Sequence, residues 1–239
     1  FVRIGEWQLF PLVIEPLKVY AGAPTGENAE ILSHMLRIHQ ATEGKGTWVL
    51  DRGFDRRQMF GPLVKNRVAF VVRQRGDRTV RTADGRHVSV NAVVAEQVCP
   101  TPRRWPTGGM SVAVEVWLPE SGPEPFLIVV GWRVPNSERP LVLLVSPAAR
   151  RAGRNGRWYV RAYHKRWGVE DANRGIKQRF GVEGFLVRSW MSIRRLLWLV
   201  AWAFWWLNLW GETSFDRLRA VLMEHPWRLR KPVTYLFNW

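Results

Sequence analysis

The chain has 239 residues, 46% of them hydrophobic, and its 36 Lys and Arg against 20 Asp and Glu give a formal net charge of +16. This composition supplies the core of one large domain, or of one domain with an insertion, and the charge indicates a polyanionic partner: nucleic acid first, an anionic membrane second. A generally basic proteome is the alternative explanation of the charge. Cys99 is the only cysteine, which excludes an internal disulfide and favours a reducing, cytoplasmic compartment. The opening FVRIGEW lacks the pattern of a secretory signal and reads as though the chain starts within a domain.

The first third of the chain alternates between strand and helix patterns, which is typical of a sheet covered by helices. We expect Asn28 to cap the first helix and Asp55 to cap the second. The predicted elements, in chain order, are strands at 2–10 and 12–20, a helix at 28–41, a strand at 47–50, a helix at 55–63 and a strand at 68–73.

A β-rich segment follows from about residue 74 to residue 132. It contains several turn clusters and little helix signal, and we interpret it as an insertion of about 60 residues. Short strands are predicted at 79–81, 88–94, 112–118 and 126–132. A buried strand at 141–146 and a basic loop then lead to a helix that carries residues 163–177.

The apolar run at 196–210 contains five Trp residues and no charge. A membrane span needs about 20 apolar residues, so we predict a buried core helix, with membrane association as the alternative. Thr213 and Asp216 form a capping box for a further short helix to Met223.

One helical face in the 163–177 segment carries a carboxylate among cations. Tyr163, Arg166, Glu170 and Lys177 fall within about 80° of arc on a regular helix, and Arg174 lies on the same stripe. A carboxylate can hold a metal while neighbouring cations take phosphate oxygens, so this pattern suits a metal-bound phosphate. A solvated helix face with ordinary ion pairs is the alternative for Glu170.

Asp51 comes directly after the apolar strand at 47–50 and two residues before Gly53. Functional side chains gather at the carboxyl ends of strands in open α/β sheets, so Asp51 is a candidate metal ligand. Capping of the following turn is an equally good interpretation.

These residues together resemble the DDE transposases of bacterial insertion sequences. The resemblance rests on the strand followed by Asp51-Arg-Gly-Phe54, on the β insertion, and on Tyr163-x2-Arg166-x3-Glu170-x6-Lys177, the signature of one subgroup. It covers about residues 1–210. It implies a ribonuclease-H-like mixed sheet with flanking helices, in which three acids bind two divalent metal ions, normally Mg²⁺.

The resemblance also assigns roles to individual residues. Asp51 matches the second acid and Glu170 the third, while the first acid belongs to a strand expected upstream of Phe1, so the chain is expected to be truncated. Arg166, Arg174 and Lys177 would hold DNA phosphates, and Tyr163 would bind a phosphate or pack under Arg166. Trp105, beside two Arg, matches by position an aromatic that stacks on a displaced base, although an ordinary loop anchor is the alternative.

We therefore expect a transposase that acts in the bacterial cytoplasm, at the nucleoid, on double-stranded DNA, as a dimer on paired ends and without a membrane partner. The predicted segments are 1–73 and 133–210 for the ribonuclease-H-like core, 74–132 for the insertion and 211–239 for a basic tail. The alternatives are a catalytically incomplete DNA-binding remnant or inhibitor, a repair or recombination nuclease on the same kind of sheet, and a peripheral membrane protein.

Overall fold

A computed structural model describes residues 2–4, 8–10, 26–97, 103–104, 110–119, 122–132, 140–170, 174 and 189–211. The chain divides into two compact units. We call Lys18–Trp167 the sheet unit, and Phe1–Leu17 with Gly168–Trp239 the terminal unit, and describe each by itself.

The main sheet of the sheet unit has six strands in the order β3-β4-β10-β9-β8-β7. β3 and β4 are parallel, and the other neighbours are antiparallel. The strands are β3 (Trp48–Leu50), β4 (Phe70–Arg73), β7 (Arg103–Arg104), β8 (Met110–Val116), β9 (Phe126–Trp132) and β10 (Leu141–Val145). A separate antiparallel hairpin joins β5 (Thr79–Arg81) to β6 (His87–Ser89).

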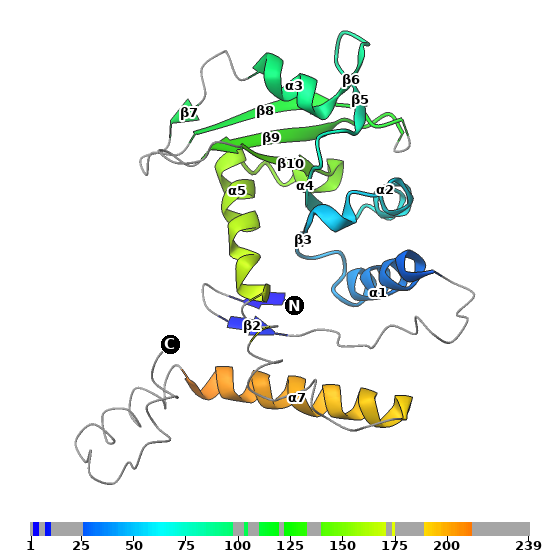
Figure 1. Ribbon diagram of the computed structural model, residues 1–239, viewed down its shortest axis with the longest axis vertical. Helices are drawn as coiled ribbons and strands as arrows, with labels where there is room; N and C mark the ends of the chain where they lie inside the picture. The colour runs from blue at the N-terminus through cyan, green and yellow to red at the C-terminus, as the bar shows by residue number, and fades with distance from the viewer. Residues whose placement is uncertain are drawn as a thin grey trace, which may run out of the picture. The chain divides into compact units, whose positions relative to one another are not determined.

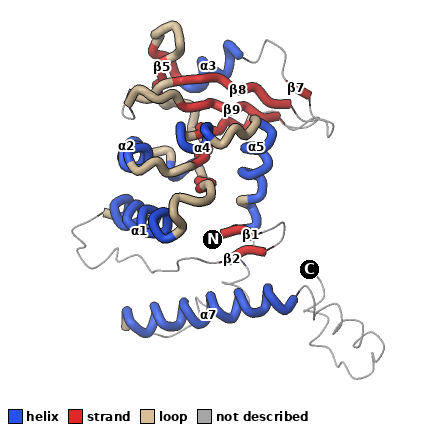
Figure 2. Tube along the Cα trace, turned by 180° about the vertical axis from the view of Figure 1, so that it is seen from behind, coloured by secondary structure: helices blue, strands red, loops and turns tan. Residues whose placement is uncertain are grey.

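Helices cover both faces of the main sheet, as Figures 1 and 2 show. They are α1 (Glu27–Ala41), the 3₁₀ turn η1 (Arg52–Phe54), α2 (Arg57–Lys65), α3 (Val90–Gln97), α4 (Pro147–Arg151) and α5 (Gly156–Lys165). Alternation along β4 separates the two cores: Phe70 and Val72 face α1, α2 and α3, whereas Val71 faces α4 and α5. The predicted α/β class and its ribonuclease-H-like mixed sheet with flanking helices are confirmed.

Ser146 fixes the sheet to α4. Its hydroxyl is buried, accepts a hydrogen bond from the Phe70 amide at 2.9 Å and donates one to the Val68 carbonyl at 3.2 Å. The same oxygen caps α4 by accepting from the Ala149 amide at 3.3 Å. One side chain therefore joins β4, the end of β10 and the start of α4.

Gly131 gives the clearest packing prediction in the sheet unit. A Cβ built on Gly131 of β9 would lie 2.6 Å from Cγ2 of Val160, whose branched side chain is stiff. We expect Gly131→Ala to lower the free energy of unfolding by about 1–3 kcal/mol through overpacking. Adding Val160→Ala makes room for the methyl group, so the double variant should be less unstable than the sum of the two single variants in chemical denaturation. Simple additivity would show that the two residues are not in contact.

Several predicted strands are confirmed, and most of them are rich in apolar residues. The strands predicted at 47–50, 68–73, 79–81, 112–118, 126–132 and 141–146 correspond to β3, β4, β5, β8, β9 and β10. β8 and β9 lie in the segment predicted as an insertion, yet they pair within the same sheet as β3 and β4. The four-segment division of the chain stays a prediction.

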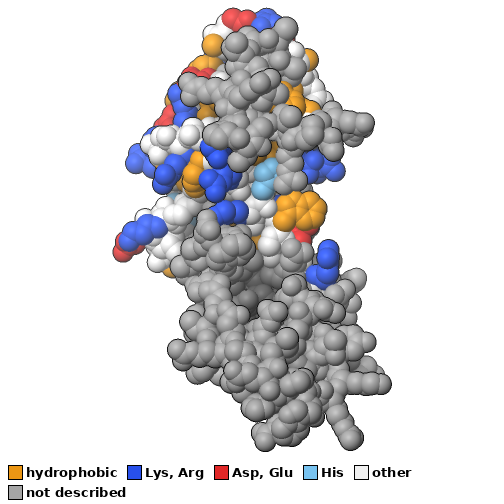
Figure 3. Space-filling model, turned by 90° about the vertical axis from the view of Figure 1, so that its left-hand side faces the viewer, with side chains coloured by type: hydrophobic (Ala, Val, Ile, Leu, Met, Phe, Trp, Pro, Cys, Tyr) orange, Lys and Arg blue, Asp and Glu red, His pale blue; other side chains and the backbone are white. Residues whose placement is uncertain are grey.

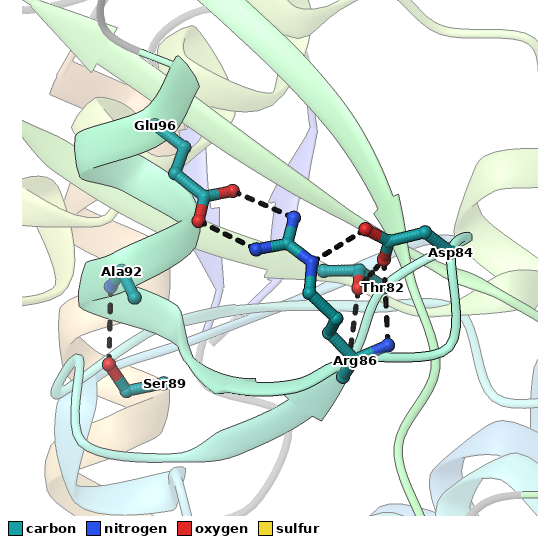
Figure 4. A network of polar contacts seen from close by, with 6 residues as sticks. All are labelled: Thr82, Asp84, Arg86, Ser89, Ala92 and Glu96. Atoms are coloured by element: carbon teal, nitrogen blue, oxygen red, sulfur yellow. Dashed lines mark hydrogen bonds and ion pairs between the residues drawn. The ribbon is translucent and has the colours of Figure 1, made fainter.

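The strand predicted at 88–94 is confirmed at 88–89, in β6, but is wrong from Val90 onward. β6 ends at Ser89 and α3 begins at Val90, because Val90, Val93 and Val94 bury one helical face and the Ser89 hydroxyl accepts from the Ala92 amide at 3.1 Å. Figure 4 shows this junction together with a polar network on the β5–β6 hairpin.

The hairpin network is centred on Arg86, which bonds Glu96 of α3 at 3.0 Å and Asp84 at 2.6 Å. Hydrogen bonds from Thr82 and Arg86 lower the pKa of Asp84 to about 2. The network therefore ties the hairpin turn to α3 through solvent-exposed ion pairs.

The predicted helix caps are also wrong. Gly26 occupies the N-cap of α1, and the Asn28 side chain instead contacts Gln58 and Arg56 of the α2 region. Asp55 does not cap α2; its carboxylate binds the Arg75 amide and the Arg78 guanidinium. In both cases a tertiary partner outcompetes the local cap.

Two further sequence predictions differ from the structure. The segment 147–157, predicted as a basic loop, contains α4 and the first two residues of α5. The single strand predicted at 2–10 is a hairpin of β1 (Val2–Ile4) and β2 (Gln8–Phe10). Cys99, the strand predicted at 12–20 and the helix predicted to end at Met223 lie outside the described residues.

The terminal unit contains the β1–β2 hairpin and α7 (Trp190–Gly211), which packs against β2. Val200 and Ala201 are buried, but Trp198, Leu199 and Trp202 are exposed, so the predicted burial does not extend around the whole helix. In the part of the chain that the structure describes, no helix combines the length and apolar content of a membrane span.

Candidate active site

The carboxyl ends of the two parallel strands bring together the candidate acid and a set of cations. β3 and β4 pair in register, with Leu50 opposite Val72. Asp51 therefore follows β3 at the same sheet edge at which Arg73 ends β4. Side chains at this edge are well placed to act on one ligand.

The Asp51 carboxylate is fixed by its own turn. Asp51 is the N-cap of η1, and its Oδ1 accepts a hydrogen bond from the Gly53 amide at 2.8 Å. Within the described residues no cation lies within ion-pairing distance of Asp51, whose side chain is half-buried. The capping interpretation of Asp51 is confirmed, and the bond leaves Oδ2 free of this turn to bind a further group.

Four residues further on, Asp55 has a structural environment. Its side chain is 2% exposed, and its Oδ1 lies 2.7 Å from Nε of Arg78, while Oδ2 accepts from the Arg75 amide at 3.0 Å. The Arg78 guanidinium in turn lies 4.5 Å from the ring centroid of Phe60, a fully buried core residue. Asp55 thus ties the chain after β4 to the base of the Asp51 turn.

An open cleft of about 410 Å³ lies beside this ion pair. It is lined by Asp55, Arg57, Arg75, Asp77, Arg78, Thr79 and Pro119. Sequence reasoning did not find Arg73 or Arg75 as site residues. Arg73 ends β4 and Arg75 follows it, and β4 runs parallel to β3, the strand before Asp51. Their position at the end of a predicted strand was the one feature of the sequence that could have identified them.

The signature helix is less regular than predicted. α5 ends at Lys165, Arg166 is a turn whose amide bonds the Tyr163 carbonyl at 3.0 Å, and residues 167–170 and 174 are helical. The prediction of an uninterrupted helix from Tyr163 is therefore wrong at Arg166. Gly168, a poor helix former, follows two residues after Arg166.

The signature residues differ in their burial. Tyr163 is buried in the core beneath α5, and Arg166 lies over its ring at 5.4 Å from the centroid, as the packing interpretation expects. Glu170 is half-buried and Arg174 exposed, both on helical backbone of the terminal unit. Lys177 and Trp105 lie outside the described residues.

The residues described contain no group of three or more His, Cys, Asp and Glu side chains able to hold a metal. Asp51 nevertheless offers the hard oxygen ligand that Mg²⁺ prefers. On the side of the sheet unit that carries α5, Lys and Arg side chains gather at the surface (Figure 3). This face is electrostatically suited to a polyanion.

A mixed sheet with helices on both faces, an acid at the carboxyl end of a strand and a net charge of +16 are features expected of a protein that acts on nucleic acid. Residues 24–206 match the family model described as Transposase DDE domain, and the chain belongs to this family. Membership gives it a role in DNA transposition as a polynucleotidyl-transferase-type transposase that binds DNA. A search of curated proteins found no match.

Proposed function

We propose that this transposase cleaves and transfers DNA strands at the ends of an insertion sequence, in a reaction that depends on divalent metal. The observation that carries the proposal is the Asp51 carboxylate, held at the carboxyl end of β3 by Gly53 and next to the end of β4. Because Oδ2 of Asp51 takes no part in the Gly53 hydrogen bond, it is available to bind a metal ion.

Asp51 and Glu170 are the proposed metal ligands, and Mg²⁺ is the proposed ion. Bound Mg²⁺ supplies charge stabilisation to the attacking and leaving oxygens of an in-line displacement at phosphorus. Family membership supports divalent metal in general. The ribonuclease-H-like frame that we propose calls for a third acid besides Asp51 and Glu170.

The proposed DNA contacts are those of the signature. Arg166, Arg174 and Lys177 bind phosphates near the scissile bond, Tyr163 supports Arg166 from below, and Trp105 stacks on a base. We further propose the Tyr-Arg-Glu-Lys subgroup, a dimer on paired ends, and the domain division given above.

The test uses duplexes made from the DNA on either side of the coding sequence, incubated with Mg²⁺. The chain is assayed beside a version that starts further upstream, in frame. Metal-dependent cleavage at the element ends supports the proposal. DNA binding without cleavage by either protein supports the alternative, a catalytically incomplete remnant or inhibitor.

The phosphate contacts carry their own prediction. Replacing Lys177 with Ala should reduce the magnitude of the salt slope of DNA binding, d log K/d log[salt], by about 0.9 and weaken binding to all sequences alike. Trp105→Ala should keep the slope and weaken binding to end-containing DNA by roughly 1–3 kcal/mol, because stacking is not ionic. Fluorescence anisotropy titrations at several salt concentrations measure both effects. An unchanged slope for Lys177→Ala would remove Lys177 from the DNA contacts.

A further inference from the structure

The stretch from α4 to the end of α5 is basic throughout. Residues 147–167 contain no Asp or Glu, and their cations are Arg150, Arg151, Arg154, Arg157, Arg161, Lys165 and Arg166. All of them belong to the sheet unit. Most of them lie outside the transposase signature, so their role is not covered by the site described above.

α5 presents its cations on the side opposite its core contacts. Tyr159, Val160 and Tyr163 are buried against the sheet. Arg157 and Arg161 are spaced i, i+4; Arg161 lies about 150° and Arg157 about 115° around the helix from the centre of that buried face. Arg161 is exposed and Arg157 half-buried, so the helix turns a basic stripe away from the protein core.

An aromatic group extends this stripe at the start of α5. The Arg154 guanidinium lies over the Trp158 ring, 5.5 Å from its centroid, and the Trp158 ring contacts the buried Tyr159 edge-on at 5.3 Å. The Tyr159 hydroxyl donates to the Ala149 carbonyl at 3.1 Å. Trp158 therefore rests on a fixed support and holds Arg154 at the surface.

The cations of α4 form ion pairs, whereas those of the stripe have no carboxylate partner among the residues that the structure describes. Arg150 forms an ion pair with Glu115, and Arg151 with Glu124. For Arg154, Arg157 and Arg161, no carboxylate of the described residues lies within 4.0 Å. Unneutralised guanidinium groups on a rigid helix are good ligands for phosphate oxygens.

We propose that Arg154, Arg157 and Arg161 form a second DNA-binding surface that holds the backbone of duplex DNA outside the signature residues. The choice of DNA as the polyanion rests on the proposed function. A four-residue step advances about 6 Å along the helix, a length over which duplex DNA presents about three phosphate charges. The contacts are to phosphates and hence independent of sequence.

The experiment measures binding of the full chain to a duplex of unrelated sequence in EDTA, where no metal-dependent chemistry takes place. The variant is Arg157→Ala/Arg161→Ala. The control is Lys45→Ala/Arg86→Ala, which loses the same charge from cations already paired with Glu43 at 2.7 Å and Asp84 at 2.6 Å. Thermal unfolding of all three proteins checks that each is folded.

We expect the variant to lower the magnitude of the salt slope by about 1.8, since two phosphate contacts are lost. Between 50 and 200 mM salt, the wild-type protein should then lose roughly tenfold more affinity than the variant. The control should keep the wild-type slope to within about 0.5. Arg154→Ala alone should give half the effect of the double variant, because it removes one contact.

A variant with the wild-type slope would overturn the proposal, as would an equal loss in variant and control, which would indicate net charge alone. The same titration is repeated with duplex RNA: a loss of affinity in the variant that is confined to duplex RNA would also overturn the proposal, in favour of an RNA partner. The proposed function can fail without this inference. If Mg²⁺-dependent cleavage is absent but Arg157→Ala/Arg161→Ala still lowers the salt slope, only the proposed strand cleavage is contradicted. If Lys177→Ala lowers the salt slope but Arg157→Ala/Arg161→Ala does not, only the second DNA-binding surface is contradicted.

Discussion

Asp51→Asn is expected to lower the rate of Mg²⁺-dependent strand cleavage by at least about a thousandfold, which corresponds to about 4 kcal/mol of lost transition-state stabilisation. The substitution removes the negative charge that a divalent ion requires. It keeps an oxygen that can accept from the Gly53 amide, the bond that closes the turn at 2.8 Å. The fold should therefore persist while the chemistry is lost.

The assay is cleavage of the flanking-DNA duplexes described above, with circular dichroism to monitor folding. Glu170→Gln should show the same loss, because it removes the other proposed ligand. Asp77→Asn is the matched control, since Asp77 is an exposed acid of the neighbouring cleft and its removal changes the charge equally. Retention of more than about a tenth of the wild-type rate by Asp51→Asn would refute the ligand assignment.

Apolar periodicity was sufficient to predict most of the main sheet. β9 and β10 form almost unbroken apolar runs because both of their faces are covered by helices, and such runs are visible in the sequence. α3 was missed because the valines at 90, 93 and 94 also have high strand propensity. Only their packing on the sheet and the cap from Ser89 decide for helix.

The candidate site was predictable where chemistry and chain position coincide. Asp51 stands between an apolar strand and a Gly, and this context suffices to single it out. Arg73 and Arg75 could not be found in the same way, because their closeness to Asp51 depends on the parallel register of β3 and β4. The helix break at Arg166 was hidden for a similar reason, since spacing arguments assume a regular helix.

Asp51 and Asp55 are four residues apart but have different proposed roles, one as a metal ligand and the other in stabilising the fold. Asp51 and Asp55 flank the same turn, and a sequence pattern alone assigns capping to either. In the structure, Asp51 is half-buried with one oxygen beyond the turn, whereas both Asp55 oxygens are engaged and its side chain is 2% exposed. The two residues should therefore give opposite phenotypes.

Asp55→Ala is expected to lower the free energy of unfolding by about 3–5 kcal/mol. The substitution takes the carboxylate from an Arg78 guanidinium that is itself only 12% exposed and stacked on Phe60. It also removes the acceptor of the Arg75 amide, which joins the end of β4 to the Asp51 turn. Removing the carboxylate partner of a buried cation lowers the free energy of unfolding far more than removing that of an exposed cation, because water cannot replace the lost partner.

Urea denaturation followed by tryptophan fluorescence measures this loss. Asp84→Ala is the control, because it also removes a carboxylate from an arginine, but both of those side chains are 54% exposed, so the free energy of unfolding should fall far less than in Asp55→Ala. Asp51→Asn should likewise leave the unfolding midpoint near that of the wild-type protein. If Asp55→Ala proved as stable as Asp84→Ala, the Asp55–Arg78 pair would not support the turn. The position of Asp51 would then depend on η1 alone, and the Gly53 hydrogen bond, not the ion pair, would stabilise the turn.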